Sequence, residues 1–153
     1  MAIPNFKLSK YFSFYEMTET NYAEFALKNR EEAVQFVCPM THFLGEIIDP
    51  LREAVGPLGV SSGYRCSGLN TAVGGSPTSQ HTRGTAVDFW MPNWNWPTVT
   101  AIGPVMAKAL QALSLKGKII MEKTNSSNWI HVSRGPELSL WTGINGVYTR
   151  MTW

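Results

Sequence analysis

The chain has 153 residues, of which 44% are hydrophobic and six are tryptophan, so it is long enough to bury the core of one domain, which we expect to span residues 1–153. Its net charge of +2 comes from scattered basic residues, and this pattern argues against nucleic-acid binding. No apolar run is long enough to cross a membrane, and the first residues lack the basic and apolar regions of an export signal.

The first part of the chain is expected to be mainly helical. Apolar residues at helical spacing predict a helix over residues 22–37. Pro39 then interrupts the pattern, and Thr41 is the expected N-cap of a second helix over residues 41–55. Pro50 lies within this second helix and predicts a kink there, because proline removes one helical hydrogen bond.

The rest of the chain favours a sheet with one further helix. A strand over residues 59–65 is expected to lead into an irregular loop, rich in Gly and Ser, through residue 80, and loops of that length tend to be functional. The remaining expected elements are a strand over 85–90, a turn over 93–97, a helix over 98–113, a hairpin of 118–121 with 129–133, and a closing hairpin over 143–148 with an Asn-Gly turn.

Three side chains in this pattern form a set of metal donors. His81, Asp88 and His131 supply two imidazoles and one carboxylate, the donor set of a catalytic zinc site that leaves one coordination position for water. Asp88 and His131 lie in alternating segments, so each can project from one side of a small sheet. His81 precedes the turn that Gly84 allows, and its loop can fold back to the same point.

A histidine bonded to a carboxylate is common in proteins and needs no metal, so the pair of His81 and Asp88 alone is a weak signal. The wider combination of motifs is more specific, and it resembles the peptidase M15 family, in particular its peptidoglycan-cleaving phage and bacterial members. The resemblance extends from about residue 8 to about residue 133 and leaves residues 134–153 unplaced. The motifs that carry it are Ser62-Gly63-Tyr64-Arg65, Leu69-Asn70, Val73-Gly74-Gly75-Ser76, Ser79-x-His81-x-x-Gly84-x-Ala86-x-Asp88 and Trp129-x-His131-Val132.

Peptide hydrolysis at such a zinc site also needs an acid that moves a proton from water to the leaving amine. Glu122 is our candidate, because pairing of residues 118–122 with residues 129–131 places it opposite Trp129, on the face that carries His131. Part of the family has an acidic residue three positions before the last histidine, but here that position is Asn128, which cannot accept a proton. The alternative is that Glu122 is a solvated residue at the end of a hairpin.

Two further residues match positions near the substrate in the family. Arg65 matches the family's arginine near the metal, and its guanidinium could hold a substrate carboxylate or the oxyanion that develops at the cleaved carbonyl. It could instead form a salt bridge with a neighbour. Ser79 matches a position that resembles a substrate-contacting serine. We therefore expect Arg65 and Ser79 to bind substrate, with Arg65 also acting in catalysis.

Taken together, the residues and the resemblance predict an α+β domain in which a small antiparallel sheet bears the zinc site and helices pack against its other side. The expected function is that of a zinc metallopeptidase that hydrolyses peptide bonds in bacterial peptidoglycan stem peptides, either as a D-Ala-D-Ala carboxypeptidase or as an endopeptidase. The expected cofactor is Zn²⁺ and the expected partner is the peptidoglycan peptide, bound by a monomer, with no nucleic acid and no membrane.

The size and the missing signal resemble those of a phage-encoded lysis or virion protein, which is made in the cytoplasm and reaches the cell wall through lysis machinery or within the virion. An alternative from a different class is a non-catalytic, zinc-stabilised module that binds cell wall or serves as a structural part of a virion. The two hypotheses differ at Glu122, because a binding module would tolerate its loss.

Overall fold

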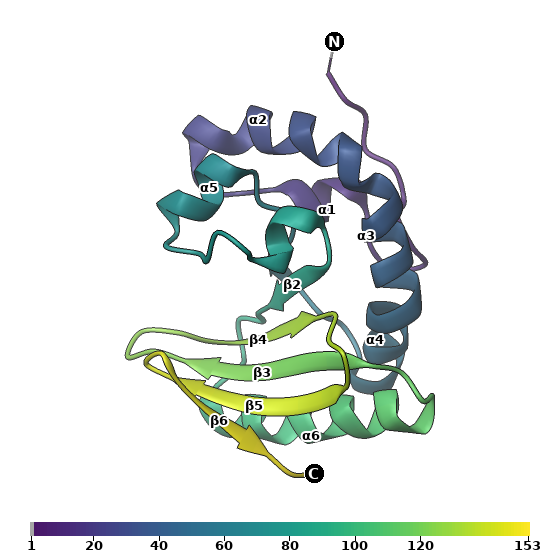
Figure 1. Ribbon diagram of the computed structural model, residues 1–153, viewed down its shortest axis with the longest axis vertical. Coiled ribbons are helices and arrows are strands. Elements are labelled where there is room, and N and C mark those ends of the chain that lie inside the picture. The colour runs from purple at the N-terminus through teal and green to yellow at the C-terminus, as the bar shows by residue number, and fades with distance from the viewer. Residues whose placement is uncertain (1) are drawn as a thin grey trace.

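The computed structural model describes residues 2–153 and combines one sheet with helices (Figure 1). The helical segments are α1 (Phe14–Thr18), α2 (Ala23–Ala33), η1 (Val34–Phe36), α3 (Val37–Phe43), η2 (Leu44–Ile48), α4 (Asp49–Val55), α5 (Ser67–Ala72), η3 (Gln80–Arg83) and α6 (Trp96–Ala112). The strands are β1 (Val60–Ser62), β2 (Ala86–Phe89), β3 (Gly117–Lys123), β4 (Asn128–Ser133), β5 (Leu138–Ile144) and β6 (Val147–Met151). This content confirms the predicted α+β class.

The sheet has six strands in the order β1-β2-β4-β3-β5-β6, and every neighbouring pair is antiparallel except β3 and β5. The parallel pair differs from the antiparallel sheet that we expected. After β4, a short connection crosses β3, and β5 pairs with the edge of β3 that β4 does not occupy. Because β4 is antiparallel to β3 and the chain reverses direction after β4, β5 runs parallel to β3. Both predicted hairpins are present, and the second turns through Asn145 and Gly146 with positive φ angles of 49° and 81°.

The second predicted helix, over residues 41–55, begins earlier than expected. The expected N-cap at Thr41 is wrong, because α3 begins at Val37 and Pro39 lies in its first turn, where a missing N–H costs no helical hydrogen bond. The run continues through η2, which has π-helical spacing, into α4, where Pro50 again occupies the first turn. The irregularity expected at Pro50 therefore takes the form of a π-helical segment rather than a break.

The long loop before His81 is also more ordered than predicted. Helix α5 occupies part of it, and its Leu69 and Asn70 are buried. Four of its six residues (Ser67, Gly68, Asn70 and Thr71) are weak helix formers and the helix is short, so burial of Leu69 and Asn70 rather than propensity explains it. The part of the loop that follows α5 lacks regular structure up to η3, as expected.

Part of the core lies on one face of the sheet, between the strands and α6, which runs beneath the sheet in Figure 1. The rest comes mainly from the helical segments and loops that precede β2. The buried side chains on this face include Ile119, Met121, Ile130, Val132 and Leu140. Because neighbouring side chains in a strand point to opposite faces, the residues between them face the other way. This second face is where the polar side chains of β2, β3 and β4 gather. Within the described residues, no helix combines the length and apolarity needed to span a membrane.

Candidate metal centre

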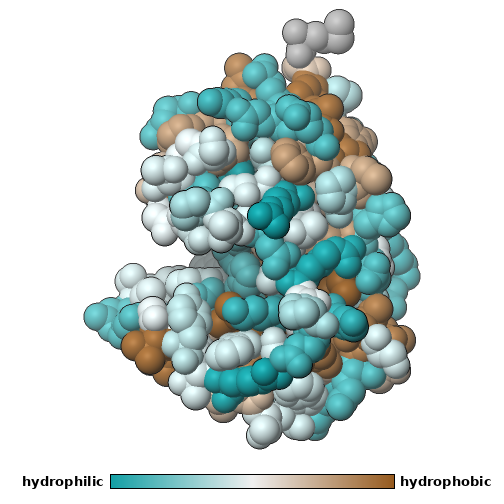
Figure 2. All heavy atoms as spheres, viewed as in Figure 1, coloured by the Kyte–Doolittle hydropathy of each residue, from teal (hydrophilic) through white to brown (hydrophobic). Residues whose placement is uncertain are grey.

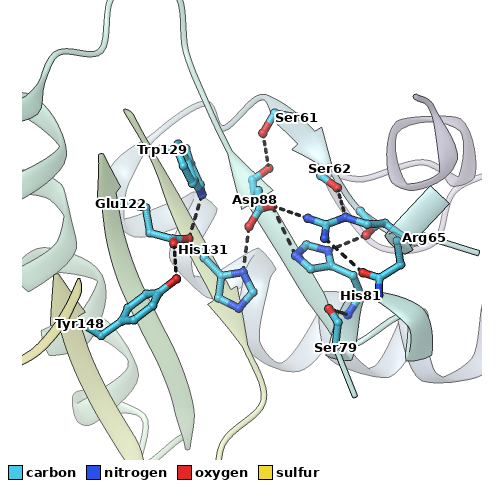
Figure 3. A network of polar contacts seen from close by, with 12 residues as sticks. Ser61, Ser62, Arg65, Ser79, His81, Asp88, Glu122, Trp129, His131 and Tyr148 are labelled. Atoms are coloured by element: carbon cyan, nitrogen blue, oxygen red, sulfur yellow. Dashed lines mark hydrogen bonds and ion pairs between the residues drawn. The ribbon is translucent and has the colours of Figure 1, made fainter. Parts of the chain in front are cut away.

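The register of the sheet brings Asp88 and His131 together. Asp88 of β2 is paired directly with His131 of β4, and Trp129, two positions before His131, is paired with Glu122 of β3. Residues two apart on a strand share a face, so His131 and Trp129 point to the same side of the sheet. The predicted pairing of Glu122 with Trp129 across the hairpin is therefore confirmed, and Figure 3 shows the resulting cluster.

His81 reaches the cluster from η3. The Ser79 hydroxyl caps this short helix by accepting a hydrogen bond from the His81 backbone N–H at 3.3 Å. The chain then turns at Gly84, which has a φ of +73° and lies so close to Met40 that a Cβ atom would be 2.6 Å from that side chain. The His81 Nδ1–H donates to the carbonyl oxygen of Gly63 at 2.7 Å, which leaves Nε2 free to face Asp88.

The three donor groups fit a single metal ion. The Nε2 atom of His81 lies 3.3 Å from Asp88 Oδ2, and the Nδ1 atom of His131 lies 2.8 Å from Asp88 Oδ1. The ligand atoms of all three residues are within 4.8 Å of one another. Ligands of a tetrahedral zinc are about 3.3–3.6 Å apart. The observed separations, from 2.8 Å to no more than 4.8 Å, span this range, and the Gly63 carbonyl supplies the outer hydrogen bond that metal-ligating histidines usually make.

Asp88 is held in its charged form. Burial alone would raise the pKa of its carboxyl group, but the charges and hydrogen bonds of His81 and His131 outweigh this effect and hold the pKa well below its usual range. Arg65 adds a salt bridge of 3.0 Å to Asp88 Oδ2. A carboxylate that stays ionised at neutral pH is the form that binds a metal cation.

Arg65 lies at the edge of the cluster with three polar contacts. Its Nε donates to Ser62 Oγ at 2.8 Å, one terminal nitrogen donates to Asp88, and the other lies 3.5 Å from the side-chain oxygen of Asn70. The structure thus combines the two readings of the sequence, because Arg65 forms a salt bridge and also lines the cleft above the metal donors.

Glu122 faces the same cleft as the metal donors. Its two carboxylate oxygens accept hydrogen bonds from Trp129 Nε1–H at 2.9 Å and from the Tyr148 hydroxyl at 3.1 Å. Burial raises the pKa of Glu122, and the nearby charge of Asp88 adds to this, while His131 and the two hydrogen bonds partly oppose it. Glu122 is therefore partly buried and hydrogen-bonded, rather than a solvated residue at a hairpin end.

Asn128 does not share this cleft. It is paired with Lys123 and lies beside Trp94 and Trp96 in a separate hollow. Since Asn128 and Trp129 are neighbours in β4, their side chains point to opposite faces. An acid introduced at position 128 is therefore not expected to reach the metal donors.

The cleft has a volume of about 480 Å³ and separates the loop between α5 and η3 from the face of the sheet. Figure 2 shows the surface hollowed between the helical part of the molecule and the sheet. Ser79 lies in the loop wall, and Glu122, Trp129 and His131 form the opposite wall. A second hollow, lined by Ser61, Trp90 and Ser127, adjoins the cleft at Asp88 and Trp129.

Tyr148 also lines the cleft, and sequence reasoning missed it. It lies in β6, in the part of the chain that the resemblance did not place. The Asn145-Gly146 turn held the necessary signal, because a two-residue turn pairs Ile144 with Val147 and therefore Gly143 with Tyr148. What the turn could not reveal was that β5 lies beside β3 and so brings Tyr148 toward Glu122.

Comparison with known proteins agrees with the geometry. A family model described as Peptidase M15 matches residues 18–133 of the chain. The chain belongs to the peptidase M15 family. The matched region contains the three metal donors, Arg65 and Glu122, and ends before β5 and β6. A search of curated proteins found no match. Membership in the M15 family confirms the resemblance seen in the sequence and, with the cluster of donors, indicates a metallopeptidase.

Replacing Arg65 should affect both stability and activity. Arg65 and Asp88 form a largely buried pair, and removing one partner leaves the other charge uncompensated, so we expect Arg65→Ala to lower the stability of the metal-free protein by on the order of 3 kcal/mol. A bound metal ion would supply positive charge to Asp88, so the loss should be smaller in the metal-loaded protein. Thermal unfolding of both forms measures this difference.

Arg65→Lys is the matched variant, because it keeps the charge but loses the planar fork. We expect peptidase activity to decrease from wild type to lysine to alanine. A lysine variant with undiminished turnover would mean that Arg65 supplies only charge. An equal loss of stability in the metal-free and metal-loaded alanine variants would contradict the pairing argument.

Proposed function

We propose that the protein is a zinc metallopeptidase that hydrolyses peptide bonds in the stem peptides of bacterial peptidoglycan. The observation that carries this proposal is that two histidines and one aspartate share a cleft with a glutamate on the same face of the sheet. This arrangement provides a metal site and a proton acceptor in one place. The choice of substrate rests on the resemblance of the motifs to wall-cleaving M15 members.

The residues of the cleft would have different roles in hydrolysis: metal binding, proton transfer and substrate binding. When bound by His81, Asp88 and His131, zinc would act as a Lewis acid on the scissile carbonyl and lower the pKa of water to about 7. Glu122 would accept the proton that the attacking water loses and deliver it to the leaving amine nitrogen. The positive charge of Arg65 would attract a substrate carboxylate or the developing oxyanion. The Ser79 hydroxyl, which accepts from the His81 N–H, keeps its own proton to donate to the substrate.

The cleft and the hollow beside it leave room for endopeptidase as well as carboxypeptidase activity. The hollow at Ser61, Trp90 and Ser127 continues from the cleft past Asp88 and Trp129. A peptide that lies across the metal donors therefore finds room on both sides of the scissile bond. A carboxypeptidase would instead need the space on one side to end at a group that binds the terminal carboxylate, a role that Arg65 could fill.

Digestion of purified peptidoglycan tests the proposal. The zinc-loaded protein is incubated with peptidoglycan of several cross-link types, and mass spectrometry identifies the products. An endopeptidase releases shortened stems or resolved cross-links with new amino termini, whereas a carboxypeptidase releases free D-alanine. The Glu122→Gln variant serves as a matched control for contaminating hydrolases. Absence of any new product across the panel would refute the proposed activity.

The alternative of a non-catalytic, zinc-stabilised wall-binding module has one observation in its favour. Both oxygens of Glu122 already accept hydrogen bonds from the protein, which is also how a purely structural carboxylate is held. The two functions differ in a sedimentation assay combined with product analysis. A module would remain bound to peptidoglycan without releasing products, and Glu122→Gln would bind as well as wild type.

A further inference from the structure

The C-terminal hairpin of β5 and β6 lies outside the region that matches the M15 family, yet it reaches the candidate site. Strand β5 pairs with β3 in a parallel register that places Gly143 beside Glu122. Strand β6 in turn places Tyr148 beside Gly143. Trp129, Glu122, Gly143 and Tyr148 therefore form one row across four strands, on the face that bears His131.

The lack of a side chain at Gly143 leaves space for the Tyr148 ring to lie across β5. A Cβ atom at this position would lie 2.7 Å from Tyr148 Cε1 and 3.2 Å from Glu122 Cγ. Any side chain here would therefore push the ring away from the carboxylate. The absence of a side chain lets the ring lie across the strand and brings its hydroxyl to Glu122 Oε1 at 3.1 Å.

The two hydrogen-bond donors to Glu122 lie on opposite sides of it within this row. The Trp129 indole N–H holds Oε2 and the Tyr148 hydroxyl holds Oε1, as Figure 3 shows. One hydrogen bond would still allow the carboxylate to rotate about its terminal torsion, which is intrinsically soft. Two donors from separate strands fix the plane of the carboxylate, and each oxygen keeps a second lone pair for a proton.

We propose that Tyr148 is a positioning residue, which holds the Glu122 carboxylate in the orientation needed for proton transfer and so makes the C-terminal hairpin part of the active site. This inference rests on the proposed function, because it assigns Tyr148 a role in a reaction whose base is Glu122. Tyr148 is 53% exposed, so its ring also forms a wall of the cleft that a substrate can contact.

The test compares Tyr148→Phe, which removes only the hydroxyl, with Gly143→Ala, which keeps the hydroxyl but displaces the ring. We expect each to lower kcat for peptidoglycan cleavage by about tenfold, the low end for a hydrogen bond to a charged group, with little change in KM or metal content. Tyr11→Phe is the matched control, because Tyr11 donates to Glu53 at 3.2 Å on an exposed surface away from the cleft. Its kcat should equal that of wild type.

A double-mutant cycle separates positioning from general structural support. Because Tyr148 acts through Glu122, Tyr148→Phe should cause no further loss in the Glu122→Gln background. Wild-type kcat in Tyr148→Phe would overturn the proposal. A tenfold loss that persists in the Glu122→Gln background would overturn it as well, since the hydroxyl would then act by another route.

A readout independent of activity distinguishes failure of this inference from failure of the proposed function. Burial, Glu122 and the more distant Asp88 raise the pKa of the Tyr148 phenol. In the zinc-loaded protein with ¹³C-labelled tyrosine, the titration of Tyr148 should therefore move to lower pH in Glu122→Gln. An unchanged Tyr148 titration overturns the contact. If wild-type protein cleaves no peptidoglycan, the proposed activity fails, and this titration still decides whether Tyr148 holds Glu122.

Discussion

Glu122→Gln is expected to lower the rate of peptide cleavage by about 10²- to 10⁴-fold, the usual contribution of a positioned acid or base, while fold and metal content stay unchanged. Glutamine has the same shape and its carbonyl oxygen can still accept one of the bonds from Trp129 and Tyr148. It cannot accept a proton from water, so the chemical step loses its base. Steady-state kinetics on soluble peptidoglycan fragments, together with metal analysis, measure both quantities.

Glu53→Gln is the control for this substitution, because Glu53 is an exposed glutamate that contacts Tyr11 and Lys10 on another part of the surface. Its activity should equal that of wild type. A Glu122→Gln protein that cleaves at the wild-type rate would show that another group is the base and that the position of Glu122 on the sheet face has no catalytic meaning.

The pH dependence of kcat should carry the signature of Glu122. A base works only when it is ionised, so activity should fall as the pH drops through the pKa of Glu122. Burial raises the pKa of Glu122. The midpoint of the acid limb of the pH–rate profile should therefore lie above the ordinary pKa of a glutamate, about 4.3. The residual activity of Glu122→Gln should lack this limb. A limb that persists unchanged in the variant would belong to a different group.

Replacing any one of His81, Asp88 or His131 with alanine is expected to abolish both metal binding and activity. Even residues that only support a metal ligand contribute about 10- to 100-fold to affinity. Loss of one of three ligands should therefore weaken binding by more than about 100-fold. Metal analysis of the purified variants and competition with a chromophoric chelator measure this loss, and titration with Zn²⁺ and other divalent ions identifies the preferred metal.

His42 provides the matched control for the two histidines, because it is exposed on α3, outside the cluster. His42→Ala should retain full metal content and activity. Full metal occupancy in any one of the three alanine variants would remove that residue from the ligand set. Occupancy lost without loss of activity would separate the metal from the reaction altogether.

Much of the candidate site was determined by local sequence. The alternation of side chains in residues 85–90 and 129–133 predicted which residues share a face with Asp88 and with His131 within each strand. The direct pairing of Asp88 with His131 across β2 and β4 came from the structure. Pairing of residues 118–122 with residues 129–131 across the intervening loop predicted that Glu122 lies opposite Trp129, and the register of the hairpin confirms this. The turn at Gly84 predicted the return of His81, since few other residues adopt its positive φ.

Only the tertiary structure decided the features that depend on contacts between distant segments. Helix α5 forms because Leu69 and Asn70 are buried in the folded molecule. Arg65 contacts Asp88 across 23 positions of the chain. Strand β5 could have joined either edge of the sheet, and its place beside β3 brings Tyr148 to Glu122. No local pattern encodes such pairings, because strand order depends on which edge remains open and which apolar faces pack against α6.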